Sequence, residues 1–354
     1  MIKRIQIKNF KCYGETGVDF ALKRINFIFG DNSAGKSTFL QLIRMVLNGE
    51  GQRIDDNFKS LVFKGDESRE IKMRITAHSD QELIDKCPIY DYSKVKNKKG
   101  SFEYEGLWSI DDKNIQKNQS SENDRKCSES RHVWLPHVIH QEAARPVRMG
   151  VSVDEPNSSL KKNEAKLLSS DTVEYVNRFF TALNVPYSAV DKGRLKDNIF
   201  GVVASTGNVG AGIDGLYETA LKLYEWRNFK IESSIGCVEE NSACALLALE
   251  EPESHVNERQ ISPLMDFIFK EASDNVNGQI IIECHSELVL LKVMNLLRAK
   301  KVAITPDDVQ ILYAVKKDTG TEILECHIDG DGSIYDWPDV DGFFPERDRI
   351  IFGS

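Results

Sequence analysis

The chain has 354 residues, of which 41% are apolar, and its 55 acidic and 46 basic residues give a formal net charge of −9. This length is long for one simple domain and suits one large domain with insertions, or two lobes. The acidic balance argues against a surface broadly dedicated to DNA, and no apolar run approaches the ~18 residues of a membrane span. The seven cysteines include no C-x-x-C pair, so we expect reduced thiols, with Cys244 and Cys284 buried, in a cytoplasmic protein.

Residues 1–84 predict an N-terminal lobe of short strands around one helix. Four segments, 3–13, 17–22, 24–29 and 70–77, have the apolar patterns that are typical of strands. The opening "MIKRIQIKNF" alternates isoleucine with charged residues, so we expect a first strand there and not a signal peptide.

The segment after the third of these strands, "GDNSAGKS", fits the phosphate-binding pattern G-x-x-x-x-G-K-[ST]. The glycines permit backbone angles closed to other residues, so successive N–H groups can face one concavity and bind an anion at the start of a helix. We expect Lys36 to contact the β- and γ-phosphates of a nucleotide and the Ser37 hydroxyl to bind Mg²⁺. The expected nucleotide-binding residues are Gly30, Asn32, Ser33, Ala34, Gly35, Lys36, Ser37 and Thr38.

Residues 85–200 predict an insertion that is partly helical and partly irregular. The stretch 110–131 has almost no apolar residues, so we expect it to be flexible, whereas 171–183 has a helical pattern. The basic cluster "KVKNKK" at 94–99 is interpreted as a solvated loop. Nucleic-acid contact therefore stays open only as a local patch.

The sequence "ACALLALEEPESH" predicts a fully buried strand that ends in two adjacent carboxylates, Glu250 and Glu251. Burying adjacent charges costs free energy unless a metal or a partner compensates. A nucleotide with Mg²⁺ facing the carboxyl end of the strand supplies that compensation. We assign Glu250 an indirect role in Mg²⁺ binding and Glu251 the role of general base toward the attacking water. An ordinary acidic turn is the alternative.

A second buried strand, "QIIIE", is followed by Cys284, His285 and Ser286. Parallel strands of one sheet end at the same edge, where α/β proteins bind ligands, so we expect His285 near the paired carboxylates. There it would contact the γ-phosphate or its attacking water. A structural role is the alternative for this histidine.

The order of these motifs resembles that of the ABC-type ATPases, the group that includes the SMC, RecF and OLD families. The chain is most similar to bacterial AAA/OLD-like ATPases with a small C-terminal domain, which residues 301–354 resemble in their Asp-Trp-Pro and Gly-Phe-Phe. The resemblance implies an α/β P-loop NTPase fold of ABC-ATPase type, with a mixed sheet flanked by helices, an inserted helical and irregular region, and a small C-terminal α+β extension. Residues 201–300 would form the C-terminal ATPase lobe, and ATP and Mg²⁺ would be the cofactors.

In such ATPases a complete site needs two protomers. One provides the phosphate loop, the carboxylates and the histidine, and the other provides a signature segment whose helix N-terminus caps the γ-phosphate. The matching stretch here is 207–226, in which Gly210 and Gly212 fit, whereas Asp214 and Gly215 stand where serine and glutamine are common. A carboxylate there would repel the γ-phosphate and weaken ATP-driven dimerisation and turnover; alternatively, Asp214 caps its helix.

The resemblance also implies a glutamine that couples the metal to the insertion, and Gln141, after the apolar strand "HVWLPHVIH", is the candidate. Arg145 is an alternative, and a structural role is open for both residues. The stretch "DGDGS" at 329–333 lacks the glycine and glutamate of a calcium loop, so we expect a hairpin turn.

The leading functional hypothesis is a homodimeric ATPase switch that acts on a separate effector protein. The resemblance suggests bacterial defence against phage or DNA maintenance. The alternative is an ATP-stabilised scaffold or sensor oligomer with slow or no hydrolysis, for which Asp214 and Gly215 are the best support. P-loop kinases and GTPases are disfavoured, because the chain has no N-K-x-D motif and its doubled carboxylate is typical of hydrolysing ATPases.

Overall fold

The computed structural model describes residues 1–47, 63–66, 71–78, 101–111, 114–117, 137–141, 169–190, 193–229 and 245–338. The strands are β1 (Ile2–Lys8), β2 (Val18–Ala21), β3 (Ile25–Gly30), β4 (Ile71–His78), β5 (Ser101–Asp111), β6 (Asn114–Lys117), β7 (His137–Gln141), β8 (Tyr187–Ala189), β9 (Arg194–Asp197), β10 (Val203–Ser205), β11 (Ala245–Glu250), β12 (Gln279–Glu283), β13 (Val309–Lys317) and β14 (Gly320–Cys326). The α-helices are α1 (Lys36–Leu47), α6 (Ser170–Ala182), α7 (Ala211–Arg227), α8 (Glu258–Asp274) and α9 (Glu287–Ala299). None of the helices in these ranges is both long and apolar enough to span a membrane.

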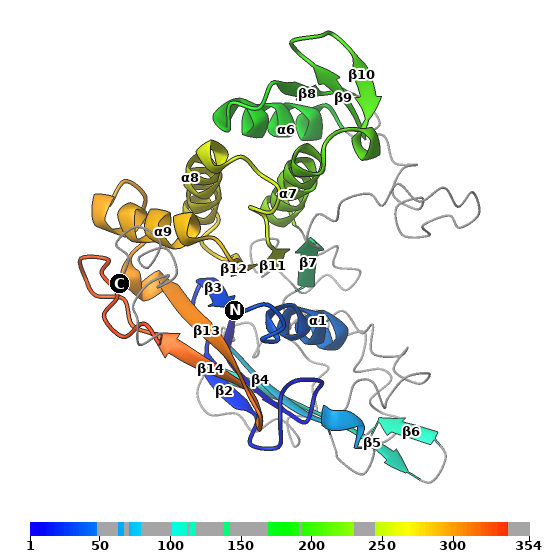
Figure 1. Cartoon of the computed structure of the whole chain (residues 1–354), viewed down its shortest axis with the longest axis vertical. Helices are drawn as coiled ribbons and strands as arrows, with labels where there is room; N and C mark the ends of the chain where they lie inside the picture. Colours follow the sequence, from blue (N-terminus) through cyan, green and yellow to red (C-terminus); the bar gives the residue numbers. More distant parts are fainter. Residues whose placement is uncertain are drawn as a thin grey trace, which may run out of the picture.

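A six-stranded sheet in the order β14-β13-β3-β12-β11-β7 forms the centre of the described fold (Figure 1). From β13 to β7 the neighbouring strands are parallel, and β14 returns antiparallel to β13 at one edge. The inner strands are continuous apolar runs because both faces of a parallel sheet are covered. This sheet confirms the predicted mixed α/β fold.

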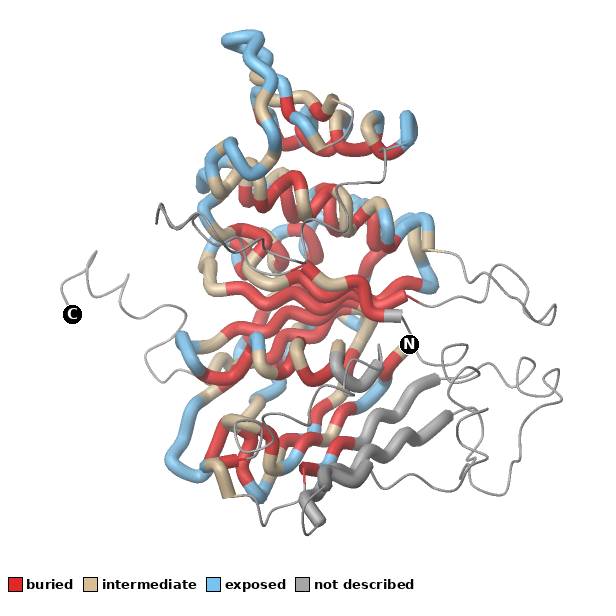
Figure 2. The backbone as a smooth tube through the Cα atoms, turned by 90° about the vertical axis from the view of Figure 1, so that its right-hand side faces the viewer, coloured by how far each residue is buried: buried red, intermediate tan, exposed pale blue. Residues whose placement is uncertain are grey.

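Alternate residues of these strands enter two hydrophobic cores, one on each face of the sheet. Phe27, Leu249 and Ile282 pack in the core that includes side chains of α6, α7, α8 and α9. Ile28 and Leu246 pack in the other core, with side chains of α1 and β1. Figure 2 shows the buried strands as a central layer, with α6, α7, α8 and α9 on one side and α1 with the second sheet on the other.

The second sheet is antiparallel, in the order β2-β1-β4-β5-β6. Within this sheet β1 lies between β2 and β4, since Ile5 is in register with Phe20 of β2 and with Ile75 of β4. Gln279 of β12 ties the two sheets together, because its side chain accepts from the backbone N–H of Ile2 at 2.9 Å and donates to the carbonyl of Ile2 at 2.8 Å. Together with β3 in the central sheet, the four strands predicted for the N-terminal lobe are present.

Residues 309–326 extend the central sheet. β13 pairs in parallel with β3, the strand before the phosphate loop, with Ile311 in register with Phe27. The sequence assigned these residues to a small C-terminal extension beginning at 301, and the structure places them in the sheet that carries the loop. The predicted turn at 329–333 is confirmed, because the Asp329 N–H donates to the Ser333 carbonyl at 2.9 Å.

The described part of the predicted insertion includes α6, β8 and β9. These two strands form a small sheet, β10-β9-β8, with β10 just after the insertion, and the sheet leads into α7. The Ser169 hydroxyl accepts from the Thr172 N–H at 3.2 Å and so caps α6 at the start of the predicted helical pattern. The other elements described within 85–200 are the strands β5, β6 and β7. Most of 110–131 and all of 94–99 lie outside the described residues.

A buried carboxylate joins α6, α7 and α8. Glu271 of α8 is 1% exposed, and its oxygens accept from Arg178 of α6 at 3.2 Å and from Arg227 of α7 at 2.6 Å. Both arginines are partly exposed. The link holds the helix layer of the first core together.

We expect Glu271→Ala to lower the free energy of unfolding by about 2–4 kcal/mol, since it removes two charge-assisted hydrogen bonds but leaves guanidinium groups that can return to water. Urea denaturation measures this loss. Glu225→Ala is the matched control, because Glu225 pairs with Lys222 at the surface and its loss is expected to cost less than ~0.5 kcal/mol. Equal losses in the two variants would contradict the role given to Glu271.

Candidate functional site

The phosphate-loop pattern occupies the turn between β3 and α1. Gly30, Ser33 and Gly35 have φ angles of 134°, 64° and 100°, a region that residues with a Cβ rarely adopt. A Cβ on Gly30 would lie 2.2 Å from the carbonyl oxygen of Ala314, so glycine is required where β13 approaches the loop. Because α1 begins at Lys36, the loop ends at a helix N-terminus, where an anion can bind.

The other predicted loop residues lie in the same turn and at the start of α1. Asn32 and Ser33 are exposed, Ala34 is buried, and Thr38 is partly buried in the first turn of α1.

Two neighbouring segments hold the loop from outside. The buried Tyr13 hydroxyl donates to the Gly35 carbonyl at 2.9 Å. The Thr321 hydroxyl of β14 donates to the Ala34 carbonyl at 2.9 Å, and the Thr321 N–H donates to the Cys12 carbonyl at 2.8 Å. The conformation of the loop therefore depends on β14 as well as on β3.

Lys36 and Ser37 bring an ammonium and a hydroxyl to the same part of the site. Lys36 Nζ donates to the carbonyls of Gly30 and Asp31, each at 2.8 Å. Burial lowers the pKa of Lys36, and the nearby Glu283 carboxylate opposes that shift. The Ser37 hydroxyl donates to Glu283 Oε1 at 2.8 Å.

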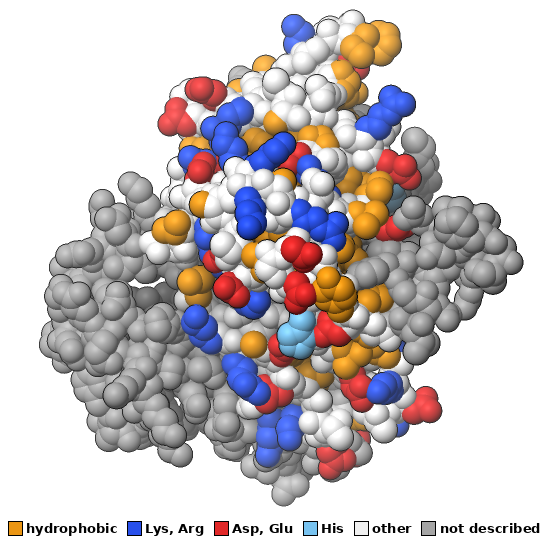
Figure 3. Space-filling model, turned by 90° about the vertical axis from the view of Figure 1, so that its left-hand side faces the viewer, with side chains coloured by type: hydrophobic (Ala, Val, Ile, Leu, Met, Phe, Trp, Pro, Cys, Tyr) orange, Lys and Arg blue, Asp and Glu red, His pale blue; other side chains and the backbone are white. Residues whose placement is uncertain are grey.

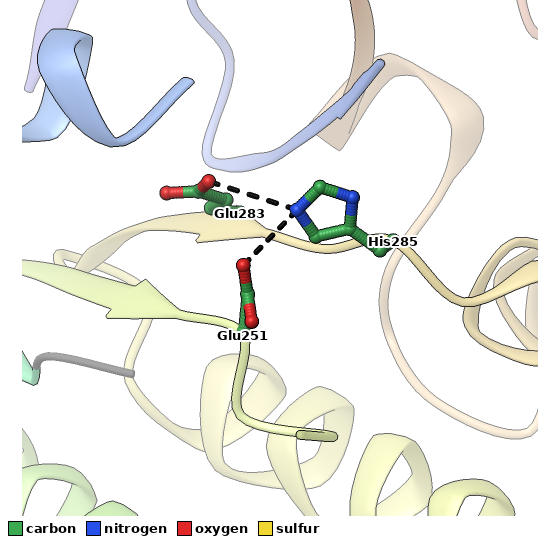
Figure 4. A group of neighbouring side chains, drawn as sticks. All are labelled: Glu251, Glu283 and His285. Carbon is green, nitrogen blue, oxygen red and sulfur yellow. Dashed lines mark ion pairs between the residues drawn. The ribbon is translucent and has the colours of Figure 1, made fainter. Parts of the chain in front are cut away.

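The carboxylates of "LALEEPE" lie where adjacent parallel strands end. Glu250, the last residue of β11, is in register with Glu283, the last residue of β12. Glu251 follows with a φ of 45°, and its N–H donates to the Glu283 carbonyl at 2.9 Å. Glu251 Oε1 lies 3.0 Å from Nε2 of His285 (Figure 4). The predicted base and the predicted histidine are thus side by side at the sheet edge that carries the phosphate loop.

Glu283 is a site residue that the sequence analysis did not single out. It is 2% exposed, and burial raises its pKa to about 7, although the bond from Ser37 and the charge of Lys36 lower it. Its Oε2 is buried and accepts no hydrogen bond from the described residues. The signal was available, because "QIIIE" ends a buried strand in a carboxylate just as "LALE" does.

Glu253 fixes the turn that carries His285. Its Oε1 accepts from the backbone N–H groups of His285 at 2.8 Å and Ser286 at 3.3 Å. Burial raises the pKa of Glu253, and these backbone bonds oppose the shift. The last residue of Glu-Glu-Pro-Glu is therefore a positioning residue for the histidine, a role that the sequence did not indicate.

Two further side chains hold Glu250. Nε2 of His140 in β7 lies 2.8 Å from Glu250 Oε1, and Nδ1 of the same ring lies 2.9 Å from Nη1 of Arg44 in α1. A guanidinium can only donate, so Nδ1 accepts and Nε2 carries the proton that is donated to Glu250. These two hydrogen bonds connect the helix after the phosphate loop to Glu250, the carboxylate predicted to act on Mg²⁺. The sequence analysis missed it, since a histidine inside an apolar strand is no sign of its partner.

We expect His140→Ala to raise the Mg²⁺ concentration needed for half-maximal ATP hydrolysis by about ten- to a hundredfold, as is typical when a partner of a metal-site residue is lost. His140→Gln keeps an N–H donor and is expected to retain most of the wild-type Mg²⁺ dependence. The measurement is ATP turnover against Mg²⁺ concentration at saturating ATP. If both variants lose turnover equally at every Mg²⁺ concentration, His140 only supports the fold.

Gln141 is buried beside α7. Its Nε2 donates to the Gly215 carbonyl at 3.3 Å, and its Oε1 accepts from the Thr219 hydroxyl at 2.9 Å. These contacts favour the structural alternative for Gln141, and the role in metal coupling stays a prediction. Arg145 lies outside the described residues.

The signature stretch forms the N-terminus of α7. Its N-cap is Gly210, so the alternative that Asp214 is the cap is wrong, because Asp214 lies within the first turn. Burial raises the pKa of Asp214. A Cβ on Gly212 would lie 2.2 Å from the carbonyl oxygen of His255, so glycine at this position lets α7 pack closely against the turn after β11. A Cβ on Gly210 would meet nothing within 4 Å.

The donor set fits ATP with a divalent cation. The site combines a helix N-terminus, the Lys36 ammonium and the Ser37 hydroxyl with carboxylates at two strand ends. One atom from each of Glu251, Glu283 and His285 lies within 4.8 Å of the others, a separation that one ion can bridge. The unpartnered Glu283 Oε2 is a buried anionic atom that a cation would stabilise.

A family model described as an AAA domain matches residues 4–188. This match covers more than half of the chain. The chain belongs to this family. The phosphate loop of this AAA domain protein lies inside the matched part, whereas β11, β12 and α7 lie beyond it.

Solved structures are similar to the AAA domain protein over almost its whole length. An SMC head bound to the C-winged helix domain of ScpA has a TM-score of 0.59 at 12% identity, over 93% of this chain and 98% of that chain. The SMC head domain from Thermotoga maritima has a TM-score of 0.50 at 12% identity, with 92% and 99% covered. An Smc head with an extended coiled coil, bound to the C-terminal domain of ScpA derived from Pyrococcus furiosus, has a TM-score of 0.56 at 10% identity, over 92% of this chain and 96% of that chain.

At these identities the likeness shows the fold alone, which is the P-loop fold of SMC head ATPase domains. No curated protein matches the chain.

Proposed function

We propose that the chain is an ATP-hydrolysing ABC-type ATPase that closes as a homodimer on ATP and acts as a conformational switch for a separate partner protein. The observation that carries this proposal is the meeting of Glu251 and His285 at 3.0 Å, on the sheet edge that also carries Lys36 and Ser37. Sites of phosphoryl transfer need these groups together, because catalysis there is positioning and charge stabilisation.

Each group has a role in this reaction. The loop N–H groups and Lys36 bind the phosphates, and the Ser37 hydroxyl and Glu250 act toward Mg²⁺. When bound, Mg²⁺ neutralises charge that develops on the phosphates. Glu251 accepts the proton of the attacking water, and His285, fixed through its backbone by Glu253, donates a hydrogen bond to the γ-phosphate or orients that water. His140 keeps Glu250 in place.

The exposed N-terminus of α7 supports the proposed dimer. In the family resemblance this helix N-terminus caps the γ-phosphate of the other protomer, and the open space around Gly210 supports such a contact. Two of the similar SMC head structures contain ScpA. By analogy we propose a separate effector for this chain, in bacterial defence against phage or in DNA maintenance.

Charge gives little support for nucleic acid as the main partner. The net charge is −9. On the face in Figure 3, Lys and Arg side chains of the described residues are interspersed with Asp and Glu. A dedicated DNA surface would gather basic side chains into one patch.

An ATP-stabilised scaffold is the second candidate, and Asp214 favours it. The side chain lies in the first turn of α7, and burial raises its pKa. A carboxylate there repels a γ-phosphate whenever it is ionised. Closure of the dimer would then be weak and turnover slow.

Steady-state ATP hydrolysis, measured with the molecular mass in the presence and absence of ATP, tests these functions. The switch predicts turnover and an increase from monomer to dimer mass with ATP. Two results would replace the switch by the scaffold. They are tight ATP binding with no turnover, and an oligomer whose mass in ATP is the same for the wild type and Glu251→Gln. Absence of ATP binding would remove both.

A further inference from the structure

The carboxylate that contacts the predicted metal-binding hydroxyl is Glu283. Its Oε1 accepts from Ser37 at 2.8 Å, whereas Glu250 Oε1 is engaged by His140. The Glu283 side chain is 2% exposed, and its Oε2 has no hydrogen-bond partner among the described residues. Such a buried carboxylate is costly unless a proton or a cation neutralises it.

Two further ligand groups converge on Glu283. Figure 4 shows the carboxylates of Glu251 and Glu283 reaching the same nitrogen of His285, at 3.0 Å and 4.0 Å. Ligand atoms of the three residues all lie within 4.8 Å of one another. The two carboxylates suit Mn²⁺ as well as Mg²⁺, and the imidazole adds a nitrogen ligand that first-row transition metals accept, whereas Mg²⁺ prefers oxygen ligands alone.

The local charge also favours a cation. The positive group near the cluster is the ammonium of Lys36, which already donates to the carbonyls of Gly30 and Asp31. The carboxylates of Glu251 and Glu283 outnumber this ammonium. Glu250, next to Glu283 in the strand register, adds further negative charge.

We propose that Glu283, Glu251 and His285 form a divalent-cation site in the chain itself, which binds Mn²⁺ in preference to Mg²⁺ and fills before a nucleotide binds. The site deepens and rests on the proposed function, since it lies beside Ser37. It adds a ligand, Glu283, to the metal role predicted for Glu250. The cation and the phosphates would then meet at the Ser37 hydroxyl.

The test is a Mn²⁺ titration of the nucleotide-free full chain, followed by the loss of the free-ion signal in electron paramagnetic resonance. We expect saturable binding by the wild type and an increase of at least tenfold in the Kd of Glu283→Gln. Glu258→Gln is the control, because it removes an exposed carboxylate from the first turn of α8, outside the site, without removing a ligand. Its Kd is expected to change less than threefold. Equal Mn²⁺ affinity of wild type and Glu283→Gln would overturn the site.

A second readout identifies the ligand nitrogen and covers the case in which Glu283→Gln does not fold. Pulsed paramagnetic resonance of the Mn²⁺-loaded chain is expected to show a nitrogen coupling that His285→Ala loses. Persistence of that coupling in His285→Ala contradicts the site. ATP binding in the presence of Mg²⁺ separates the two proposals: if ATP binds with Mg²⁺ and the Mn²⁺ results fail, only the site is wrong, whereas failure of ATP binding removes the proposed function.

Discussion

Glu251→Gln is expected to lower kcat for ATP hydrolysis by about a hundredfold or more, the usual contribution of a general base. Glutamine keeps the size of the side chain and can still face His285, so ATP should bind with nearly wild-type affinity. The variant is then expected to accumulate as an ATP-bound dimer. Single-turnover hydrolysis and light scattering with ATP measure the two effects.

Glu258→Gln is the control for this prediction. It removes an exposed carboxylate from the first turn of α8, outside the site. Wild-type turnover in Glu258→Gln with loss in Glu251→Gln isolates the base. A Glu251→Gln variant that turns over at more than a third of the wild-type rate contradicts the role of Glu251.

Lys36→Ala is expected to weaken ATP binding by about ten- to a hundredfold, because a charge-assisted contact to phosphate contributes roughly 1.5–3 kcal/mol. Hydrolysis should fall with it, since the same ammonium stabilises charge on the β- and γ-phosphates during transfer. Isothermal titration with ATP measures the affinity.

Lys292→Ala is the matched control, because Lys292 pairs with Asp266 between α9 and α8 at 2.8 Å. Its ATP affinity should equal that of the wild type. Similar losses in both lysine variants would show that Lys36 acts through the stability of the fold and has no direct contact with ATP.

The phosphate loop and the ends of β11 and β12 could be predicted because their causes are local. Gly30 and Gly35 stand where the backbone needs positive φ angles, and the Lys-Ser pair follows at a fixed offset. The apolar runs before Glu250 and His285 mark strands covered on both faces, so the polar residues after them had to lie at one edge of the sheet.

The pairings that complete the site were not predictable, because they join residues far apart in the sequence. His140 meets Glu250 across the β7–β11 pair, and its ring meets Arg44 of α1. The contact of Ser37 with Glu283 depends on the parallel register of β3 and β12. No local pattern fixes such a register.

The position of the C-terminal strands was not predictable for the same reason. β13 pairs with β3 although the strands are separated by most of the chain, and Thr321 then reaches the phosphate loop. The family resemblance, carried by Asp-Trp-Pro and Gly-Phe-Phe, assigned 301–354 to a small C-terminal domain, and these motifs contain no information about which strand β13 joins.

The central claim is a site shared between two chains, and hydrolysis by a mixture of two inactive variants tests it most directly. One variant is Lys36→Ala. The other is Gly210→Glu, whose side chain meets nothing in its own chain and would enter the site of the partner from the N-cap of α7. Gly330→Glu, also in open space but in the 329–333 turn and outside the signature stretch, is the control and should remain active.

Each variant alone is expected to hydrolyse ATP at a few per cent of the wild-type rate or less. In the mixed dimer, the loop of the Gly210→Glu chain faces the intact α7 of the Lys36→Ala chain, so one complete site forms. The account predicts that mixing restores about a quarter of the wild-type rate, the statistical share when chains pair at random. A mixture no more active than its components, or a Gly210→Glu chain with wild-type activity by itself, would contradict a shared site.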